Sequence, residues 1–190
     1  MGIIKKIEEF SKWVAITGFR TEKLDDTDEL VKDIRRKVRD VHIQFFDASL
    51  IAGWEHLYFA TLNALKSFKD KMNISKSLSV ETLLFASAQR QIKKAVELLG
   101  INSSPSQIII LVIADTEKRA KESLEIVSEL FPGERDDGVI ELSSEKFEYI
   151  KTLFGITNLE LNSKLINKEH EMQALIDLVI EHVALLAINR

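Results

Sequence analysis

The chain has 190 residues, of which 45% are hydrophobic and 29% charged, and its net charge is −4. This apolar content is too high for a disordered protein, and the length fits one domain over residues 1–190. The absence of cysteine excludes disulfides, thiolate chemistry and cysteine-ligated metals. Charges interrupt the apolar N terminus, and no window is apolar enough for a membrane span. We therefore expect a cytoplasmic protein with no membrane partner.

The first half of the chain predicts two strands and three helices. Runs of β-branched and aromatic residues predict strands over 13–19 and 41–46. Apolar residues at helical spacing predict helices over 25–40, with Thr27 as N-cap, and over 54–68. After a polar break at 73–79, the same spacing predicts one continuous helix over 80–99, with Gly100 as its C-cap.

The second half contains the most apolar predicted strand. Seven consecutive apolar residues within 107–114 indicate a central strand that is buried on both faces. Asp115 and Thr116 are expected to cap a helix that ends before Pro132. A short strand over 138–142 and helices over 143–154 and from about 167 to the end complete the prediction. The order indicates an α/β domain with a single mixed β-sheet of about four strands and helices packed on it.

Motifs for nucleotide and metal chemistry are absent from the sequence. The seven glycines stand alone, which excludes a phosphate-binding loop and a dinucleotide fingerprint. The histidines, His42, His56, His170 and His182, lack the spacing of a helical zinc site, and His42 is expected at the surface or at an interface. We expect no cofactor, no metal and no small-molecule substrate.

Three local clusters allow both a catalytic and a structural interpretation. The acidic residues Asp25, Asp26, Asp28 and Glu29 could hold a cation, but they are more typical of a helix N-terminus. The sequence of residues 143–146, Ser-Ser-Glu-Lys, has a serine–lysine spacing, although serines between a strand and a helix are usually caps. Asp115 follows the central strand, where enzymes place catalytic groups, but capping again explains it better. We expect no catalysis.

Positive charge is concentrated in one stretch of this acidic chain. Residues 66–94 contain seven basic and two acidic residues, a net charge of +5, so the rest of the chain carries −9. On a helical wheel Arg90, Lys93 and Lys94 form one stripe, opposite Ile92, Ala95 and their apolar neighbours. Such a stripe could contact RNA phosphates, or it could simply solvate the helix.

The C-terminal segment 183–188 contains six consecutive apolar residues. A terminal segment of this kind frays unless something covers it. Either the domain's own sheet or a partner protein could provide that cover.

Several sequence motifs resemble a known family. They are Asn73-Ile-Ser-Lys-Ser-Leu78, Glu81-Thr-Leu-Leu-Phe-Ala86, Arg90-Gln-Ile92 with Ala95, Leu99-Gly-Ile101, Phe46-Asp47, Glu55-His56-Leu57, Phe154-Gly-Ile-Thr157 and the run from Asp177 to Leu186. Together they resemble the small kinase-binding subunit of the KEOPS complex, the PRPK-binding protein family, in its archaeal type. The resemblance covers roughly residues 14–188 and leaves residues 1–12 as an N-terminal extension.

This resemblance implies an α/β fold and a role without catalysis. Members of the family bind the small lobe of the KEOPS kinase-like ATPase and support threonylcarbamoylation of adenosine 37 in tRNAs that read codons beginning with A. Archaeal-type members grip tRNA at its 3′ CCA end. We therefore expect RNA contacts from Asn73, Lys76, Arg90, Lys93 and Lys94, and kinase contacts from Leu185 and Leu186.

One departure from the family pattern concerns Ala88, where the family often has glycine before its Arg-Gln-Ile. Alanine favours a continuous helix at this point. Two other functions remain open on the sequence alone. The protein could be a pure protein-interaction module without RNA contact, or a small enzyme that uses Asp115 and a histidine.

Overall fold

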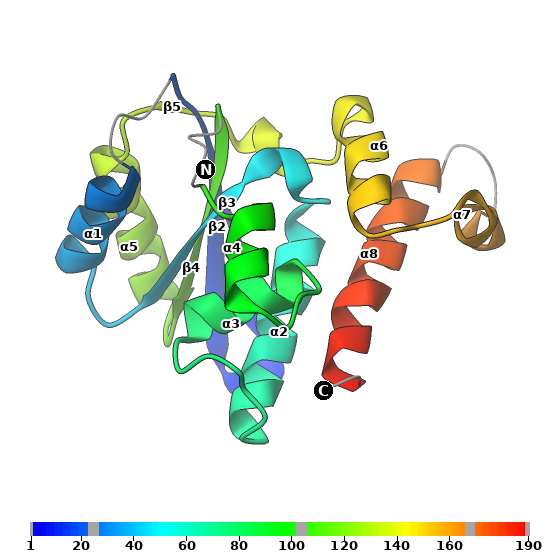
Figure 1. Cartoon of the computed structure of the whole chain (residues 1–190). Coiled ribbons are helices and arrows are strands. Elements are labelled where there is room, and N and C mark those ends of the chain that lie inside the picture. Colours follow the sequence, from blue (N-terminus) through cyan, green and yellow to red (C-terminus); the bar gives the residue numbers. More distant parts are fainter. Residues whose placement is uncertain (1, 23–26, 102–105, 166–169, 189–190) are drawn as a thin grey trace.

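A computed structural model describes residues 2–22, 27–101, 106–165 and 170–188. One sheet lies between two helical layers, and a group of C-terminal helices packs outside the second layer (Figure 1). The described strands, in sheet order, are β1 (Ile3–Ile7), β2 (Lys12–Arg20), β4 (Gln107–Ala114) and β3 (His42–Asp47), and a short β5 (Glu134–Arg135) pairs with β2. The predicted α/β architecture is confirmed, but all of these pairings are antiparallel, so the sheet is not mixed.

The predicted central strand is confirmed as β4, which pairs with β2 on one side and β3 on the other. Its side chains alternate between two cores because successive residues of a strand face opposite ways. Ile109, Leu111 and Ile113 belong to the core under α2 and α3, and Ile110 and Val112 belong to the core under α1 and α5. Since β4 lies between β2 and β3, the segment from β2 through α1 to β3 forms a split β-α-β unit.

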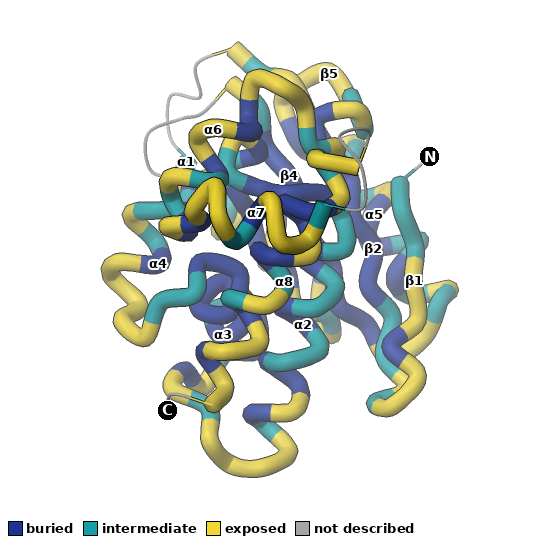
Figure 2. The backbone as a smooth tube through the Cα atoms, turned by 90° about the vertical axis from the view of Figure 1, so that its right-hand side faces the viewer, coloured by how far each residue is buried: buried dark blue, intermediate teal, exposed yellow. Residues whose placement is uncertain are grey.

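The helices divide between the two faces of the sheet. α1 (Thr27–Lys37) and α5 (Glu117–Leu130) cover one face, and α2 (Trp54–Lys69), α3 (Leu78–Ala86) and α4 (Ile92–Leu99) cover the other (Figure 1). Thr27 is the first residue of α1. α8 (Glu171–Ile188) packs on α2, while α6 (Ser144–Leu153) and α7 (Asn158–Lys164) pack with α8 in a separate apolar cluster. α7 is exposed along most of its length (Figure 2).

The predicted continuous helix over 80–99 is wrong, because the chain forms two helices there. Ala88 adopts a left-handed conformation with φ of 50°. The Ala88 amide donates to the Phe85 carbonyl, and the Gln89 amide donates to the Leu84 carbonyl, both at 3.0 Å. These two bonds form a Schellman motif, which ends α3 and turns the chain away before α4 begins. Gly100 is confirmed as the C-cap, since its amide donates to the Val96 carbonyl.

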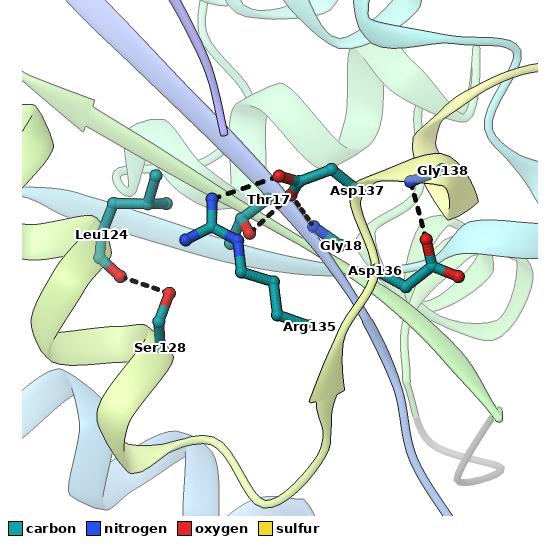
Figure 3. Close-up of polar contacts among 8 residues, drawn as sticks. All are labelled: Thr17, Gly18, Leu124, Ser128, Arg135, Asp136, Asp137 and Gly138. Atoms are coloured by element: carbon teal, nitrogen blue, oxygen red, sulfur yellow. Dashed lines mark hydrogen bonds and ion pairs between the residues drawn. The ribbon is translucent and has the colours of Figure 1, made fainter. Parts of the chain in front are cut away.

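The predicted strand over 138–142 is also wrong. Residues Asp137–Ile140 form a 3-10 helix, η3, which is held by the two aspartates at its start (Figure 3). Asp137 Oδ1 accepts from buried Thr17 Oγ1 at 2.9 Å and from the Gly18 amide at 3.2 Å. Any side chain at Gly18 would clash, because a Cβ there would lie 2.4 Å from a methyl carbon of Val139. The close approach of η3 to β2 therefore requires glycine at this position.

The apolar C-terminal segment is only partly covered by the domain. Val183 and Leu186 are buried in the apolar cluster that also contains residues of α2 and α3, whereas Leu185 and Ile188 are exposed. α8 therefore docks one side on its own domain and leaves the other side of its last turns open. None of the helices in the described residues is both long and apolar enough to cross a membrane.

Candidate nucleic-acid interface

The five predicted RNA-contacting residues lie on two segments that flank α3. The first flanking segment, residues 70–77, carries Asn73 and Lys76, and the second, residues 87–94, carries Arg90, Lys93 and Lys94. α3 itself is buried at every residue except the half-buried Val80. α3 is therefore packed inside the domain, and the two segments that carry the polar side chains adjoin its two ends.

A buried carboxylate fixes the first flanking segment. Glu81 is fully buried in α3, and its carboxylate accepts from the amides of Ile74 at 3.1 Å and Ser75 at 2.8 Å and from Ser67 Oγ at 3.2 Å. A carboxylate without hydrogen atoms can only accept, so it satisfies several donors of a tight loop at once. Glu81 therefore sets the path of the loop that carries Asn73 and Lys76.

Within this loop, the predicted polar residues differ in what they can offer to a ligand. Asn73 is half-buried, and its Nδ2 donates to the Ser75 carbonyl at 2.9 Å. Part of its hydrogen-bonding capacity is thus used inside the loop. Lys76 is exposed and forms no ion pair with any residue that the structure describes. Lys76 is therefore freer than Asn73 to contact a ligand.

A buried histidine fixes the start of the second flanking segment. His56 Nε2 lies 2.8 Å from the Ala86 carbonyl, and Nδ1 accepts from the Ala52 amide at 3.3 Å. This pairing requires the neutral ring with its proton on Nε2. Burial lowers the pKa of His56 to about 4, although the bond to the Ala86 carbonyl acts in the opposite direction. The last turn of α3 is thereby tied to the connection that precedes α2.

The predicted basic stripe on a single helix is wrong in its geometry. Arg90 lies between the Schellman turn and Gln91, the N-cap of α4, so it does not share a helix with Lys93 and Lys94. Ile92, which the helical wheel assigned to the buried side, is 42% exposed. The three cations remain close in the sequence and exposed, but a turn and one short helix present them together.

Carboxylates neutralise part of the basic stretch. Glu9 lies 3.6 Å from Lys66 and 3.7 Å from Lys69, and Glu97 lies 3.8 Å from Lys93. Such exposed pairs are weak, so Lys93 can exchange Glu97 for another anion. Lys94, like Lys76, forms no ion pair within the described part of the chain. The cationic surface is therefore centred on the two flanking segments rather than on α2.

Exposed apolar side chains lie among these cations. Met72 and Ile74 in the first flanking segment are 55% and 42% exposed, and Ile92, beside Lys93, is 42% exposed. Cations that alternate with apolar side chains can contact phosphates and the faces of unpaired bases at the same time. The surface therefore fits a single-stranded nucleic acid better than the backbone of a duplex alone.

Sequence reasoning missed a second group of cations, on the second half of α1 and the connection that follows it. Residues 32–39 contain five basic residues and one acidic residue, a net charge of +4. The net charge of residues 32–39, considered separately from the rest of the chain, could have identified this group from the sequence. Of this group, Arg35 lines a cavity with Ser77, the last residue of the first flanking segment.

The two predicted kinase-contacting residues differ in exposure. Leu185 is 47% exposed, whereas Leu186 is only 6% exposed and belongs to the core. A direct contact through Leu186 would therefore require the core to open. Ile188, which the prediction did not single out, is exposed beyond Leu185 and extends the apolar surface.

The side chains considered for catalysis are engaged elsewhere. Asp115 pairs with Lys12, which lowers the pKa of its carboxyl, and Thr116 Oγ1 alone caps α5, so the predicted cap by Asp115 is wrong. Lys146 donates to the carbonyls of Val139 and Glu141 rather than to a serine, and burial lowers its pKa to about 8. Of the acidic cluster, Asp25 and Asp26 lie outside the described residues. The residues described include no group of three or more potential metal ligands.

Comparison with known proteins gives two matches. Residues 22–187 match the family model described as "Kinase binding protein CGI-121". The chain is 31% identical to the "Regulatory protein Cgi121" of Methanocaldococcus jannaschii over 135 residues, which are 71% of this chain and 83% of the relative. Both flanking segments of α3 lie inside the region matched by the family model, whereas β1 and β2 precede it.

Proposed function

Because the chain belongs to the CGI-121 family of kinase-binding proteins, we propose that it is a non-catalytic subunit of a KEOPS complex. In this role it binds the kinase-like ATPase and recruits tRNA by its 3′ CCA end, and the complex then modifies adenosine 37 to threonylcarbamoyladenosine. The observation that carries the RNA part is the pair of cationic segments held at the two ends of α3.

The chemistry of these segments supports a single-stranded RNA end as the ligand. Lys76 and Lys94 are exposed and unpaired among the described residues, and Ile74 and Ile92 lie exposed close to them in sequence. Phosphates supply affinity through cations, and unpaired bases add contacts through their faces. A CCA end offers both features, because its bases have no Watson–Crick partners.

The open side of α8 supports the second part of the proposal, the binding of a protein partner. Leu185 and Ile188 are exposed and lie one helical turn apart, so their side chains share one face. Exposed apolar residues on one helix face are typical of a docking surface. We assign the kinase contact to this face, with Leu185 in contact and Leu186 supporting it from the core.

A second function is a kinase-regulating module without RNA contact. The ion pairs of Lys66 and Lys69 with Glu9 favour it, since they remove part of the cationic surface. The two functions differ in one measurable property, the affinity for tRNA.

Charge reversal tests the RNA part. We expect the double variant Arg90→Glu and Lys94→Glu to bind tRNA at least about tenfold more weakly than the wild type in a gel-shift assay, because two phosphate contacts are replaced by repulsion. The matched control is the double variant Lys118→Glu with Lys164→Glu. It changes the net charge of the protein by the same amount, but at α5 and α7 instead of the second flanking segment. Equal loss in both double variants, or no loss in either, would favour the module without RNA contact.

A further inference from the structure

A small polar cavity lies at the outer edge of the sheet, between the α1–β3 connection and the start of α3. Its volume is about 220 Å³, and its polar lining consists of Arg35, His42, Ser77 and Ser79. The remaining lining residues are aliphatic, and no carboxylate is among the described residues that line the cavity. The cavity therefore presents hydrogen-bond donors and positive charge.

Arg35 is the main charged group of this cavity. One guanidinium nitrogen donates to the Ile43 carbonyl at 3.4 Å, which orients the side chain and leaves other N–H groups available. Partial burial lowers the pKa of Arg35, but an arginine stays protonated at neutral pH. Its neighbour Arg36, in contrast, pairs with Asp33 at 2.6 Å. Arg35 thus faces the cavity without a carboxylate partner among the described residues.

The other polar groups suit the oxygen atoms of an anion. Ser77 Oγ and Ser79 Oγ lie 3.0 Å apart, and Ser79 is only 6% exposed. His42 stands at the start of β3, and the ion pair between Lys12 and Asp115 lies within electrostatic reach of its ring. A planar guanidinium with nearby hydroxyl groups is a common arrangement for binding phosphate oxygens.

We propose that this cavity binds one backbone phosphate of the nucleic acid held on the flanking segments of α3, through Arg35, Ser77 and Ser79. The cavity is continuous in sequence with the first flanking segment, because Ser77 directly follows the exposed Lys76. An RNA strand that crosses Lys76 would then enter the cavity and reach Arg35 on α1. This inference rests on the proposed RNA binding and extends its path to the edge of the sheet.

The test compares two neighbouring arginines of α1. Arg35→Gln removes the cavity's guanidinium, and Arg36→Gln is the matched control, which loses the same charge from a side chain that is 73% exposed. We expect Arg35→Gln to weaken tRNA binding about tenfold in a fluorescence anisotropy titration. The slope of log K against log salt concentration should fall by about 0.7–0.9, and Arg36→Gln should change affinity by less than about twofold. Ser79→Ala provides a second variant if Arg35→Gln does not fold.

A titration with inorganic phosphate separates the sources of the anion and the two proposals. In the wild type we expect phosphate to shift the NMR signals of the His42 ring, and in Arg35→Gln this shift should disappear. If phosphate binds but Arg35→Gln and Ser79→Ala leave tRNA affinity unchanged, the assignment to a nucleic-acid phosphate is overturned. If the wild type does not bind tRNA at all, the proposed RNA function fails. If phosphate leaves the His42 signals unchanged, the cavity is not a phosphate-binding site.

Discussion

α3 and α8 are both built largely from apolar residues, yet the domain encloses only one of them. α3 packs against β3, α2, α4 and α8, and it is buried almost throughout. α8 also packs against four helices, α2, α3, α6 and α7, but its last turns leave Leu185 and Ile188 exposed. An enclosed helix can hold polar segments rigidly at its ends, and a half-covered helix can receive a partner. On this contrast rests our proposal that RNA binds at the ends of α3 and the kinase on the open side of α8.

The largest expected effect concerns the buried anchor of the first flanking segment. Glu81→Ala should lower the free energy of unfolding by about 4 kcal/mol, because it leaves the amides of Ile74 and Ser75 without their acceptor and opens a cavity. Urea denaturation measures this loss. Glu81→Gln keeps the shape and one acceptor oxygen, so it should cost clearly less. Similar small losses in both variants would show that the carboxylate does not hold the loop.

The second effect concerns the anchor of the other flanking segment and depends on pH. The pKa of His56 is lowered from 6.5 to about 4, so the unfolded chain binds a proton between these values and the folded chain does not. The contribution of the neutral His56 ring to the free energy of unfolding is therefore fully present above pH 6.5. It is lost as the pH is lowered, by about 3 kcal/mol between pH 7 and 4.

Urea denaturation across this pH range tests the expectation for His56. The background should be His42→Gln, since the pKa of His42 is also lowered, chiefly by burial. A curve that stays flat between pH 6.5 and 4.5 would show that the neutral ring of His56 does not stabilise the end of α3.

The third prediction separates two adjacent leucines of α8. Leu186→Ala should lower the free energy of unfolding by about 2–3 kcal/mol, because it empties a core site. Leu185→Ala should cost less than about 0.5 kcal/mol but weaken binding to the kinase-like ATPase, measured by calorimetry, by about tenfold. If Leu185→Ala binds the kinase as the wild type does, the open side of α8 is not the docking surface.

The smallest expected effect concerns the left-handed turn after α3. Ala88 has φ of 50°, a conformation that costs a residue with a Cβ about 1 kcal/mol relative to glycine. Ala88→Gly should therefore raise the melting temperature slightly and leave tRNA binding unchanged. The matching turn after α6 has Gly155 with φ of 65°, and Gly155→Ala should destabilise by a similar amount. An unchanged stability in both variants would mean that neither turn is strained.

The sequence predicted β4 because its apolar run is uninterrupted, and β2 because it is rich in β-branched and aromatic residues. β1 was missed, since Lys5 and Lys6 break its pattern, and exposed lysines are a common feature of edge strands. The break between α3 and α4 was missed because apolar residues continue at helical spacing across it. The turn depends on Ala88 adopting a conformation that is rare for alanine, so residue type did not reveal it.

For the candidate site, the sequence indicated which charged residues are exposed, but not how the fold holds them. Sequence reasoning singled out Lys76, Arg90, Lys93 and Lys94, and the structure shows that all four are exposed. Their supports were not predicted, because Glu81 and His56 act through backbone groups that only the folded chain brings near. Glu81 was nevertheless visible as a carboxylate inside an apolar run, a pattern that favours a buried residue with several hydrogen-bond donors around it.

The most direct test of the central claim compares intact tRNA with tRNA that lacks its 3′ CCA nucleotides. Both affinities for the wild-type protein are measured by anisotropy at one salt concentration. We predict that the truncated tRNA binds at least about tenfold more weakly, because the unpaired bases and their phosphates contribute most of the contacts. Equal affinities for the two tRNAs would contradict the assignment of the α3 flanking segments to the end of a tRNA.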